Sequence, residues 1–484
     1  MADFGFVGGA YEAPSITQDA QALINWYPEV DPTKAPGERG VIALYPTPGF
    51  FGRVYFGAAV EIRAMWVIPG GQKLYVVAGS GLYEVNTSYV GVLVGTLATS
   101  SGAVSISDNG TSLYLSDGPT RYYYTWGTGT FATIADGAFT GASRVDQVDN
   151  YIIYFQPNGN QWSATDIGAV TTSALSFGRK DSASDNIVTG IANKREVFIL
   201  GERTSEVWTD AGLFPFPFQK LAGTNMQHGC AAPLSLARLG ESFAFLSRDD
   251  RGQNVVVMMN GYIPGRISTH AVESAISKYS VVSDAVGFSY QQGGHEFYML
   301  TFPTADETWC YDLASNLWHK RARRSLDGVL HRDRANCSAF FNGEVLVGDY
   351  ESGLVYAASL TTFYDYQDGA SVGNLVPRIR RCRHITADLN RVYHHELQIQ
   401  FQPGVGLASG QGENPQAMLR WSDDGGHTWS NVRSASIGRM GEYKNRVRFT
   451  RLGASRDRIY ELTVTDPVFA VVVSADLKAS AGAS

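Results

Sequence analysis

The clearest candidate for a catalytic motif in this sequence is the stretch WSDDGGHTWS, residues 421–430. They follow the order S-x-D-x-G-x-T-W, which defines an Asp-box and consists of Ser422, Asp424, Gly426, Thr428 and Trp429. A short Asp side chain in a turn accepts hydrogen bonds from nearby backbone amides, and the Trp anchors the turn in a sheet. The motif is therefore first of all a folding device, and the rest of the chain must show whether it accompanies catalysis.

Asp-boxes are best known from sialidases, so sugar hydrolysis is the enzymatic hypothesis. A sialidase also needs an arginine cluster for the sugar carboxylate, a Tyr/Glu nucleophile pair and an acid, which come from different parts of the chain. This sequence has one clear Asp-box, where sialidases usually carry several. We interpret it as a structural hairpin, and a sialidase-like or other glycoside hydrolase remains the alternative.

Other patterns with catalytic or cofactor chemistry are weak. His394 and His395 precede Glu396, but successive residues of a strand point to opposite faces, so they do not make a helical zinc site. There is no G-x-x-x-x-G-K-[ST] motif for a nucleotide. The cysteines are far apart in sequence, which favours buried thiols over a zinc site or a disulfide framework; they are Cys230, Cys310, Cys337 and Cys382. We expect no cofactor, no metal, no catalytic residue and no enzymatic activity.

Composition and charge narrow the class of protein. The 484 residues exceed what one hydrophobic core supports, and 52 glycines with 12% aromatic residues suit many short strands joined by tight turns. The net charge of −7 is spread along the chain, which argues against a dedicated binder of the phosphate backbone. No run approaches the ~18 apolar residues of a membrane helix, and the N-terminus lacks a signal peptide pattern. We expect an all-β protein with no membrane insertion.

A repeated unit dominates residues 61–374. Each unit is a hydrophobic run, a turn rich in Gly or Asp, and a second run that often carries Tyr or Trp. The spacing of roughly 40–50 residues is that of a four-stranded propeller blade. This predicts a β-propeller, for which six blades with one hairpin outside the ring are favoured and seven blades are the alternative. The units begin near Lys73, Ser112, Tyr151, Glu196, Ser242, Glu296 and Glu344.

The flanking segments differ from the repeat. Residues 1–60 show little periodicity and are interpreted as an extended N-terminal arm with an aromatic anchor at Trp26 and Tyr27. Residues 375–477 contain long alternating strands, such as HHELQIQFQ and IYELTV, which predict a β-sandwich that carries the Asp-box hairpin. Residues 478–484 are expected to be a flexible tail.

Two dense basic clusters stand out in this acidic chain: HKRARR at residues 319–324 and RIRRCRH at residues 378–384. The favoured interpretation is that they pair with carboxylates at blade or subunit contacts, and the alternative is contact with packaged nucleic acid or an acidic partner. The candidate partner contacts are Trp26, Tyr27, Arg378, Arg380, Arg381 and Arg383.

Several longer stretches resemble a known family. INWYPEV followed by ALYPTPGF, then DNIVTGIANKREVFILGERTSEVWTDAG, QHGCAAPLSLARLGESFAFLSRD and NGYIPGRISTHAVESAIS are similar to tail-nozzle proteins of short-tailed bacteriophages. These are also called tail accessory or packaged-DNA-stabilisation proteins. The likeness covers most of the chain in order, but its motifs are structural and diffuse.

The resemblance implies a structural virion protein of the phage tail, assembled in the host cytoplasm as a homo-hexamer. It would sit below the portal and its adaptor ring, extend the DNA ejection channel, and help to retain packaged DNA, with double-stranded DNA passing transiently. Tailspikes or fibres and a tail needle or plug would dock on it. The family brings no catalytic residues. A carbohydrate-binding propeller of a fibre or adhesin is a further alternative, and we hypothesise that residues 1–60 become ordered on assembly.

Overall fold

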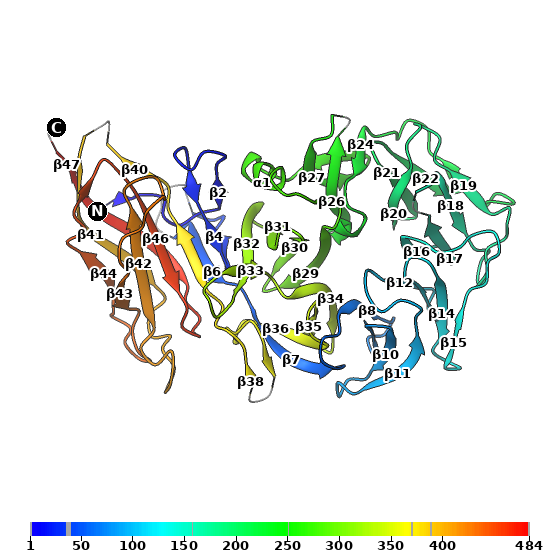
Figure 1. Cartoon of the computed structure of the whole chain (residues 1–484), viewed down its shortest axis with the longest axis horizontal. Helices are drawn as coiled ribbons and strands as arrows, with labels where there is room; N and C mark the ends of the chain where they lie inside the picture. The colour runs from blue at the N-terminus through cyan, green and yellow to red at the C-terminus, as the bar shows by residue number, and fades with distance from the viewer. Residues whose placement is uncertain are drawn as a thin grey trace.

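The computed structural model describes residues 2–34, 40–156, 158–249, 251–368, 371–387 and 390–482. Within these ranges the chain forms an elongated molecule, with a β-propeller at one end of the long axis and a β-sandwich at the other (Figure 1). The all-β fold class of propeller plus sandwich is confirmed. None of the helices in these ranges is both long and apolar enough to cross a membrane.

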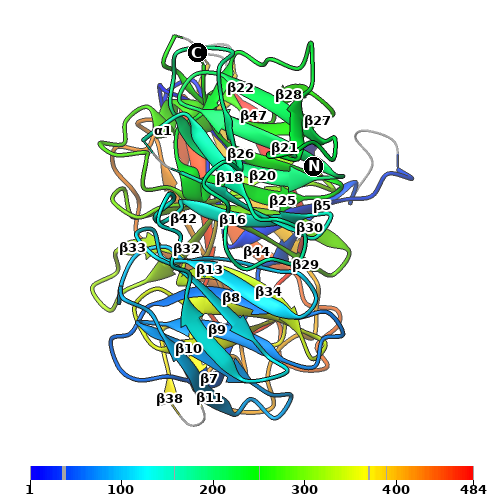
Figure 2. The same cartoon turned by 90° about the vertical axis from the view of Figure 1, so that its right-hand side faces the viewer.

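Seven antiparallel sheets form the propeller ring in the described part of the chain, so the blade number is seven, and the favoured count of six was wrong (Figures 1 and 2). All seven repeat units found in the sequence are blades. The first residue of each unit lies within one residue of the start of the strand that is second in the sheet order of its blade. The first three blades contain β8 (Ile62–Val67), β9 (Leu74–Ala78), β10 (Gly81–Val85) and β11 (Gly91–Thr96); β12 (Ser105–Asp108), β13 (Ser112–Ser116), β14 (Arg121–Thr125) and β15 (Thr130–Thr133); and β16 (Arg144–Val148), β17 (Tyr151–Phe155), β18 (Gln161–Ala164) and β19 (Phe177–Arg179).

The next three blades follow the same order, with small additions. The 3₁₀ turn η1 (Pro233–Ser235) lies in the fifth blade, and α1 (His270–Ile276) connects the fifth blade to the sixth. These blades contain β20 (Ile187–Asn193), β21 (Glu196–Gly201), β22 (Ser205–Asp210) and β23 (Phe218–Lys220); β24 (His228–Cys230), β25 (Ala237–Leu239), β26 (Ser242–Asp249), β27 (Asn254–Asn260) and β28 (Ile263–Arg266); and β29 (Val286–Gln292), β30 (His295–Phe302), β31 (Glu307–Asp312), β32 (Leu317–Arg324) and β33 (Leu330–Arg332).

Tight turns join the first and second strands of several blades. In four blades of the described chain this connection is two residues long and both residues have positive φ, as in a type I′ turn, whose twist matches that of the flanking strands. Glycine or asparagine supplies most of these conformations, whereas Lys194 and Arg195 adopt them despite their Cβ atoms. The four pairs are Asp149–Asn150, Lys194–Arg195, Gly293–Gly294 and Asn342–Gly343.

The seventh blade is completed by the N-terminal segment. β34 (Ala335–Phe341), β35 (Glu344–Asp349) and β36 (Leu354–Ser359) come from the end of the repeat, and β7 (Gly49–Tyr55) pairs antiparallel with β36 as the outer strand. The propeller therefore begins at residue 49 rather than 61. Joining the two ends of the repeat in one sheet closes the ring through backbone hydrogen bonds, and no blade is left as an open end.

The sandwich has two sheets that enclose a core of buried aliphatic and aromatic residues. Leu397, Ile399, Phe401, Val447 and Phe449 point inward, as their alternation in the sequence predicts. The first sheet contains β44 (Val447–Thr450), β41 (Val392–Phe401), β47 (Val472–Ala481), β6 (Ile42–Pro46) and β5 (Trp26–Val30), with β1 (Ala2–Asp3) and β45 (Ala454–Ser455) at its margins. The second contains β39 (Arg378–Arg381), β46 (Asp457–Val464), β42 (Gln416–Ser422) and β43 (Arg433–Ser436), with β40 (Ile385–Thr386) paired to β46.

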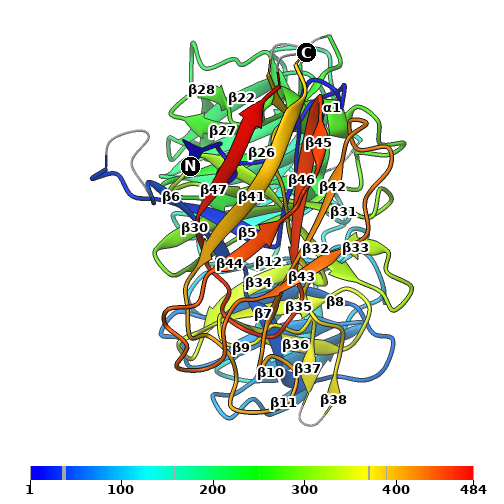
Figure 3. The same cartoon turned by 90° about the vertical axis from the view of Figure 1, so that its left-hand side faces the viewer.

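One strand of two residues joins the two domains. β4 (Leu23–Ile24) pairs in parallel with β32 of the sixth blade and antiparallel with β39 of the sandwich, so a single sheet runs through both domains. Figure 3 shows the sandwich end, where β5 and β6 lie behind β41 and β47. The domains are therefore connected by backbone hydrogen bonds as well as by side-chain packing.

The N-terminal segment is not a separate arm in this structure. β1 and β4–β7 belong to the sheets of the two domains, and β2 (Tyr11–Glu12) pairs with β3 (Ala20–Gln21) in a small hairpin. This integration argues against the hypothesis that residues 1–60 become ordered only on assembly. The expected flexible tail also differs, because β47 continues to Ala481 and pairs with β41; residues 483–484 lie outside the described residues. Two remaining strands, β37 (Gln367–Asp368) and β38 (Ser371–Val372), form a small hairpin.

Ring closure depends on a close approach at Gly353. A Cβ atom at this position would lie 2.3 Å from the carbonyl oxygen of Gly57, so a Gly353→Ala side chain would push the end of β7 away from β36. We expect a loss of about 1–3 kcal/mol in the free energy of unfolding, the usual cost of overpacking. Gly127→Ala is the matched control, because its added Cβ has no atom within 4 Å. Chemical denaturation measures both variants, and equal stability of the two would contradict closure by β7.

Candidate functional site: the junction between propeller and sandwich

The basic cluster on β39 lies inside the molecule. Arg378 and Arg380 alternate on one face of the strand and are 1% and 0% exposed. The prediction that these two residues contact a partner is therefore wrong, because this chain already covers them. Arg381 is half-buried and Arg383 is exposed, and for these two a partner contact stays a prediction.

Arg380 holds the N-terminal segment through its backbone. Its Nε donates a hydrogen bond to the Phe6 carbonyl at 2.6 Å, Nη1 donates to the Gly9 carbonyl at 2.9 Å, and Nη2 donates to Gln21 Oε1 at 2.7 Å. Burial lowers the pKa of Arg380 to about 10, so the guanidinium is still charged at neutral pH. A charged donor thus fixes three points of the segment at once.

The neighbouring arginines extend this set of contacts. Arg383 Nε donates to the Phe4 carbonyl at 2.9 Å, two residues before the Phe6 carbonyl that Arg380 contacts. Arg378 Nη2 donates to the Asp466 carbonyl at 2.7 Å, and burial lowers its pKa to about 9. The favoured interpretation of the sequence, pairing with carboxylates, applies to Arg381, which donates to Glu461, whereas the other three donate mainly to backbone carbonyls.

Asn25 connects the two domains at the strand that they share. Its side-chain Nδ2 donates to the Ala322 carbonyl of β32 and to the Pro377 carbonyl, both at 2.7 Å, and its Oδ1 accepts from the Ala322 amide at 3.0 Å. The residue is 1% exposed and has a φ of 55°, a conformation in which Asn is tolerated better than most residues. Sequence reasoning missed Asn25, because a single Asn between two short strands gives no signal.

Trp26 and Tyr27 are also internal, so their prediction as partner contacts is wrong. Trp26 is fully buried in the sandwich core and donates from Nε1 to the Ala470 carbonyl at 2.9 Å. Tyr27 faces the opposite way and packs edge-on against His295, with ring centroids 5.0 Å apart. His295 lies between Asp312 and Glu29, and its hydrogen bond to Asp312 is the main cause of its raised pKa. These contacts fasten β5 to the sixth blade.

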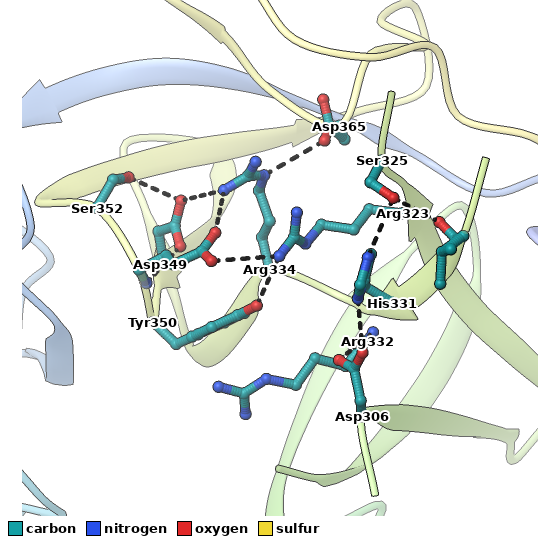
Figure 4. A network of polar contacts seen from close by, with 12 residues as sticks. Asp306, Arg323, Ser325, His331, Arg332, Arg334, Asp349, Tyr350, Ser352 and Asp365 are labelled. Carbon is teal, nitrogen blue, oxygen red and sulfur yellow. Dashed lines mark hydrogen bonds and ion pairs between the residues drawn. The ribbon is translucent and has the colours of Figure 1, made fainter. Parts of the chain in front are cut away.

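The second dense basic cluster ties the sixth blade to the seventh (Figure 4). Arg323 of this cluster lies 3.3 Å from Glu351 and donates to the Tyr350 hydroxyl at 2.9 Å. Arg334, which lies outside the cluster, extends the network and is 3.3 Å from Asp349 and 3.5 Å from Asp365. Burial raises the pKa of the Asp365 carboxyl. Pairing with carboxylates at a blade contact, the favoured interpretation of this cluster, is confirmed.

The Asp-box forms the turn between β42 and β43. Ser422 Oγ donates to Asp424 Oδ1 at 2.6 Å, and the Thr428 amide donates to the same carboxylate at 2.8 Å. These bonds, that from Ser422 above all, hold the pKa of Asp424 well below its usual range. Gly426 has a φ of 99°, which a side chain would strain. Asp424 and Thr428 are exposed, so the hydrogen bond between them is formed in contact with water.

Trp429 lies between two arginines at the outer face of the second sheet. The guanidinium of Arg420 is 4.6 Å from its ring centroid, and that of Arg381 is 5.1 Å away. Both arginines also pair with Glu461, which is 2% exposed. The Trp thus covers a buried ion-pair network and packs on the sandwich core. The carboxylate of the Asp-box serves its own turn, which gives sugar hydrolysis no support.

The cavity at the propeller axis has a structural lining. It has a volume of about 410 Å³ and includes Arg63, Trp66, Arg144 and Phe288. Arg63 donates to the carbonyls of Thr99 and Gly102, and Arg144 donates to that of Leu236 at 3.0 Å, so these arginines hold neighbouring segments together. Among the residues that the structure describes, no group of three or more His, Cys, Asp and Glu is placed to hold a metal ion.

Two family models match the chain. The model described as "Bacteriophage P22 Gp10, beta-propeller" matches residues 64–363, and that described as "Bacteriophage P22 Gp10, beta-sandwich" matches residues 378–480. No curated protein sequence matches. Solved structures show distant likeness: a chain of the "Crystal Structure of Mitotic Checkpoint Complex" has 11% identity and a TM-score of 0.42, over 68% of this chain and 96% of that chain. The N-terminal domain of Nup159 has 10% identity and a TM-score of 0.41, over 70% and 99%. We draw no conclusion from these two similarities.

A β-propeller and a β-sandwich that share a sheet define the class of this protein by its fold. The chain belongs to the bacteriophage P22 Gp10 family, since the propeller model alone matches more than half of its length. It is accordingly a phage tail protein and a structural component of the virion.

Arg380→Lys tests the attachment of the N-terminal segment. Lysine keeps the positive charge but has one nitrogen, so it cannot reach the Phe6, Gly9 and Gln21 acceptors together. We expect a loss of about 3 kcal/mol or more in unfolding free energy, because a hydrogen bond to a charged group contributes about 1.5–3 kcal/mol. Arg391→Lys, at an exposed position, is the control. Amide exchange of residues 4–22 should accelerate in the first variant, and unchanged protection would contradict the role of Arg380.

Trp429→Ala and Asp424→Ala separate the two parts of the Asp-box. Loss of the Trp removes two cation–π contacts and uncovers Glu461, so we expect a decrease of about 1–2 kcal/mol in unfolding free energy. Loss of the exposed Asp424 carboxylate leaves amides that water can reach, and the melting temperature should fall less. Thermal melting of both variants gives the comparison. A larger effect of Asp424→Ala than of Trp429→Ala would show that the turn, and not the ring, stabilises the sandwich.

Proposed function

We propose that this chain is a subunit of a homo-hexameric tail nozzle of a short-tailed phage. In this role it extends the DNA ejection channel below the portal and its adaptor ring, retains packaged DNA, and docks tailspikes or fibres and a tail needle or plug. The observation that carries the proposal is the match of both domains, in order, to the two halves of one phage tail family. Assembly in the host cytoplasm belongs to the same proposal.

The size of the axial cavity supports a conduit formed between subunits. A volume of about 410 Å³ has the size of a small-molecule pocket. We therefore place the proposed DNA channel between several copies around a common axis rather than within one propeller.

The rigid connection of the two domains also suits a ring that must withstand the pressure of packaged DNA. A sheet that runs from the sixth blade through β4 into the sandwich resists hinge motion, because bending would break its backbone hydrogen bonds. Force on either domain is then transmitted to the other. The structure offers no specific observation in favour of the glycoside hydrolase or the carbohydrate-binding propeller.

Reconstitution with the adaptor tests the proposal. The purified chain is mixed with the adaptor ring of its phage, and the product is examined by mass measurement and negative-stain imaging. We expect an annulus of six copies below the adaptor. A chain that stays monomeric and never joins the ring would refute the nozzle assignment. Turnover of a fluorogenic sialoside by the same preparation would instead favour the enzymatic alternative.

A further inference from the structure

The sandwich has an exposed basic surface that forms one end of the molecule. We call it the basic edge, and it consists of Arg433, Arg439, Lys444, Arg446, Arg448 and Arg451. Residues 433–451 contain these six basic residues and one acidic residue, Glu442. The clusters that look densest in the sequence are mostly internal, so the surface charge comes from a segment in which the basic residues are spaced apart.

The strand pattern places these side chains outward. β44 alternates, with Val447 and Phe449 buried in the core and Arg446 and Arg448 exposed. β44 and β43 pair on one side only, with β41 and β42, so both are edge strands in the part of the chain that the structure describes. Figures 1 and 3 show the two strands at the outer side of the sandwich, away from the propeller.

The side chains of the basic edge form few hydrogen bonds or ion pairs with the rest of the described chain. Lys444, Arg446 and Arg451 make no side-chain hydrogen bond or ion pair with the described residues. Arg448 lies 3.6 Å from Glu396 and Arg439 lies 3.8 Å from Glu413, and such exposed pairs contribute little. The basic edge therefore keeps most of its charge for contacts outside the chain.

Protection of an edge strand explains only part of this surface. Charged residues on β44 discourage edge-to-edge aggregation of the sheet. That explanation does not cover the connection before β44, where Met440 is 60% exposed and Tyr443 is 71% exposed beside Arg439 and Lys444. Exposed apolar side chains among arginines need a different reason.

The mixture of residue types favours a protein partner over nucleic acid. Protein interfaces are enriched in Arg, Tyr and Met and depleted in Lys, and five of the six basic residues here are arginines. A surface for the phosphate backbone needs basic residues of either type and gains little from exposed Met and Tyr. Glu442, which lies between these basic residues, would also repel a phosphate backbone.

The charge of the rest of the chain indicates which protein binds the basic edge. Residues 375–484 hold fifteen Lys and Arg against ten Asp and Glu, a net charge of +5. Residues 1–374 hold 24 against 36, a net charge of −12. The basic edge lies at the far side of the sandwich from its own propeller, so it can meet that acidic part only in another molecule (Figure 1).

We propose that the basic edge binds the acidic N-terminal and propeller part of a second copy of this chain. The contact is heterologous, since different surfaces of the two copies meet, and heterologous contacts generate a ring when the rotation from copy to copy closes. The proposal rests on the proposed function and deepens it by naming the surface that joins neighbouring subunits. Opposite charges bring the copies together, and Met440 and Tyr443 supply apolar contact area.

Charge reversal on the basic edge tests the contact. The variant is Lys444→Glu with Arg446→Glu, and the control is Arg203→Glu with Lys278→Glu, two exposed propeller positions with the same change in net charge. Sedimentation measures self-association of the full chain at several concentrations, and thermal melting checks that both variants fold. We expect the variant to weaken self-association at least about tenfold, which is about 1.4 kcal/mol. The control adds negative charge to the acidic partner surface, so it should associate at least as strongly as the wild type, and association should weaken as salt rises from roughly 0.05 M to 0.5 M.

Each other outcome is informative. Equal association of variant and wild type overturns the proposal, as does a wild-type chain that shows no self-association. A variant that loses binding to duplex DNA but still self-associates assigns the surface to nucleic acid and also overturns it. Failure of the nozzle assignment looks different: the wild type then self-associates in a charge-dependent manner but never forms an annulus with the adaptor ring.

Discussion

A buried guanidinium that donates to backbone carbonyls is the interaction on which the rest of the structure depends. Arg380 is fully buried with no carboxylate among its hydrogen-bond partners, so carbonyl dipoles and one amide side chain stabilise its charge. Leaving a charge unpaired in the interior is costly, and this cost selects the one path of the N-terminal segment that supplies the acceptors. Because three of the four acceptors are backbone carbonyls, Arg380 constrains mainly the backbone path of the segment rather than its side chains.

The course of that segment determines the architecture of both domains. After the Arg380 contacts, the chain enters β4, where Asn25 bonds to the sixth blade on one side and to the sandwich on the other. It then supplies β5 and β6 to the sandwich, and finally β7 to the seventh blade. A segment with no hydrophobic periodicity of its own thus joins the domains and closes the ring. It has these roles because its order is provided by partners that lie some 300 to 400 residues away in sequence.

The sequence predicted the features that are local and periodic. The seven hairpins and the inward residues of β41, such as Leu397 and Ile399, follow from alternation and turn residues over short stretches. The blade count and the fate of residues 1–60 depend on pairing between the two ends of the repeat, which leaves no local pattern. The same holds for Arg378, Arg380, Trp26 and Tyr27. Their residue types suggested exposed contacts, whereas burial depends on acceptors in distant segments such as the Phe6 and Ala470 carbonyls.

The distribution of basic residues follows from the same physics. A dense run such as RIRRCRH on a strand places alternate side chains in the core, and an interior arginine is tolerated only where acceptors surround it. Basic residues that alternate with core residues, as Arg446 and Arg448 do with Val447 and Phe449, instead point to solvent together. Density of charge along the sequence is therefore a poor guide to charge on the surface of a β-protein. The period-2 pattern decides which residues share a face of the strand, and the segments that cover that face decide whether its arginines are internal, as in Arg378 and Arg380, or exposed, as in Arg446 and Arg448.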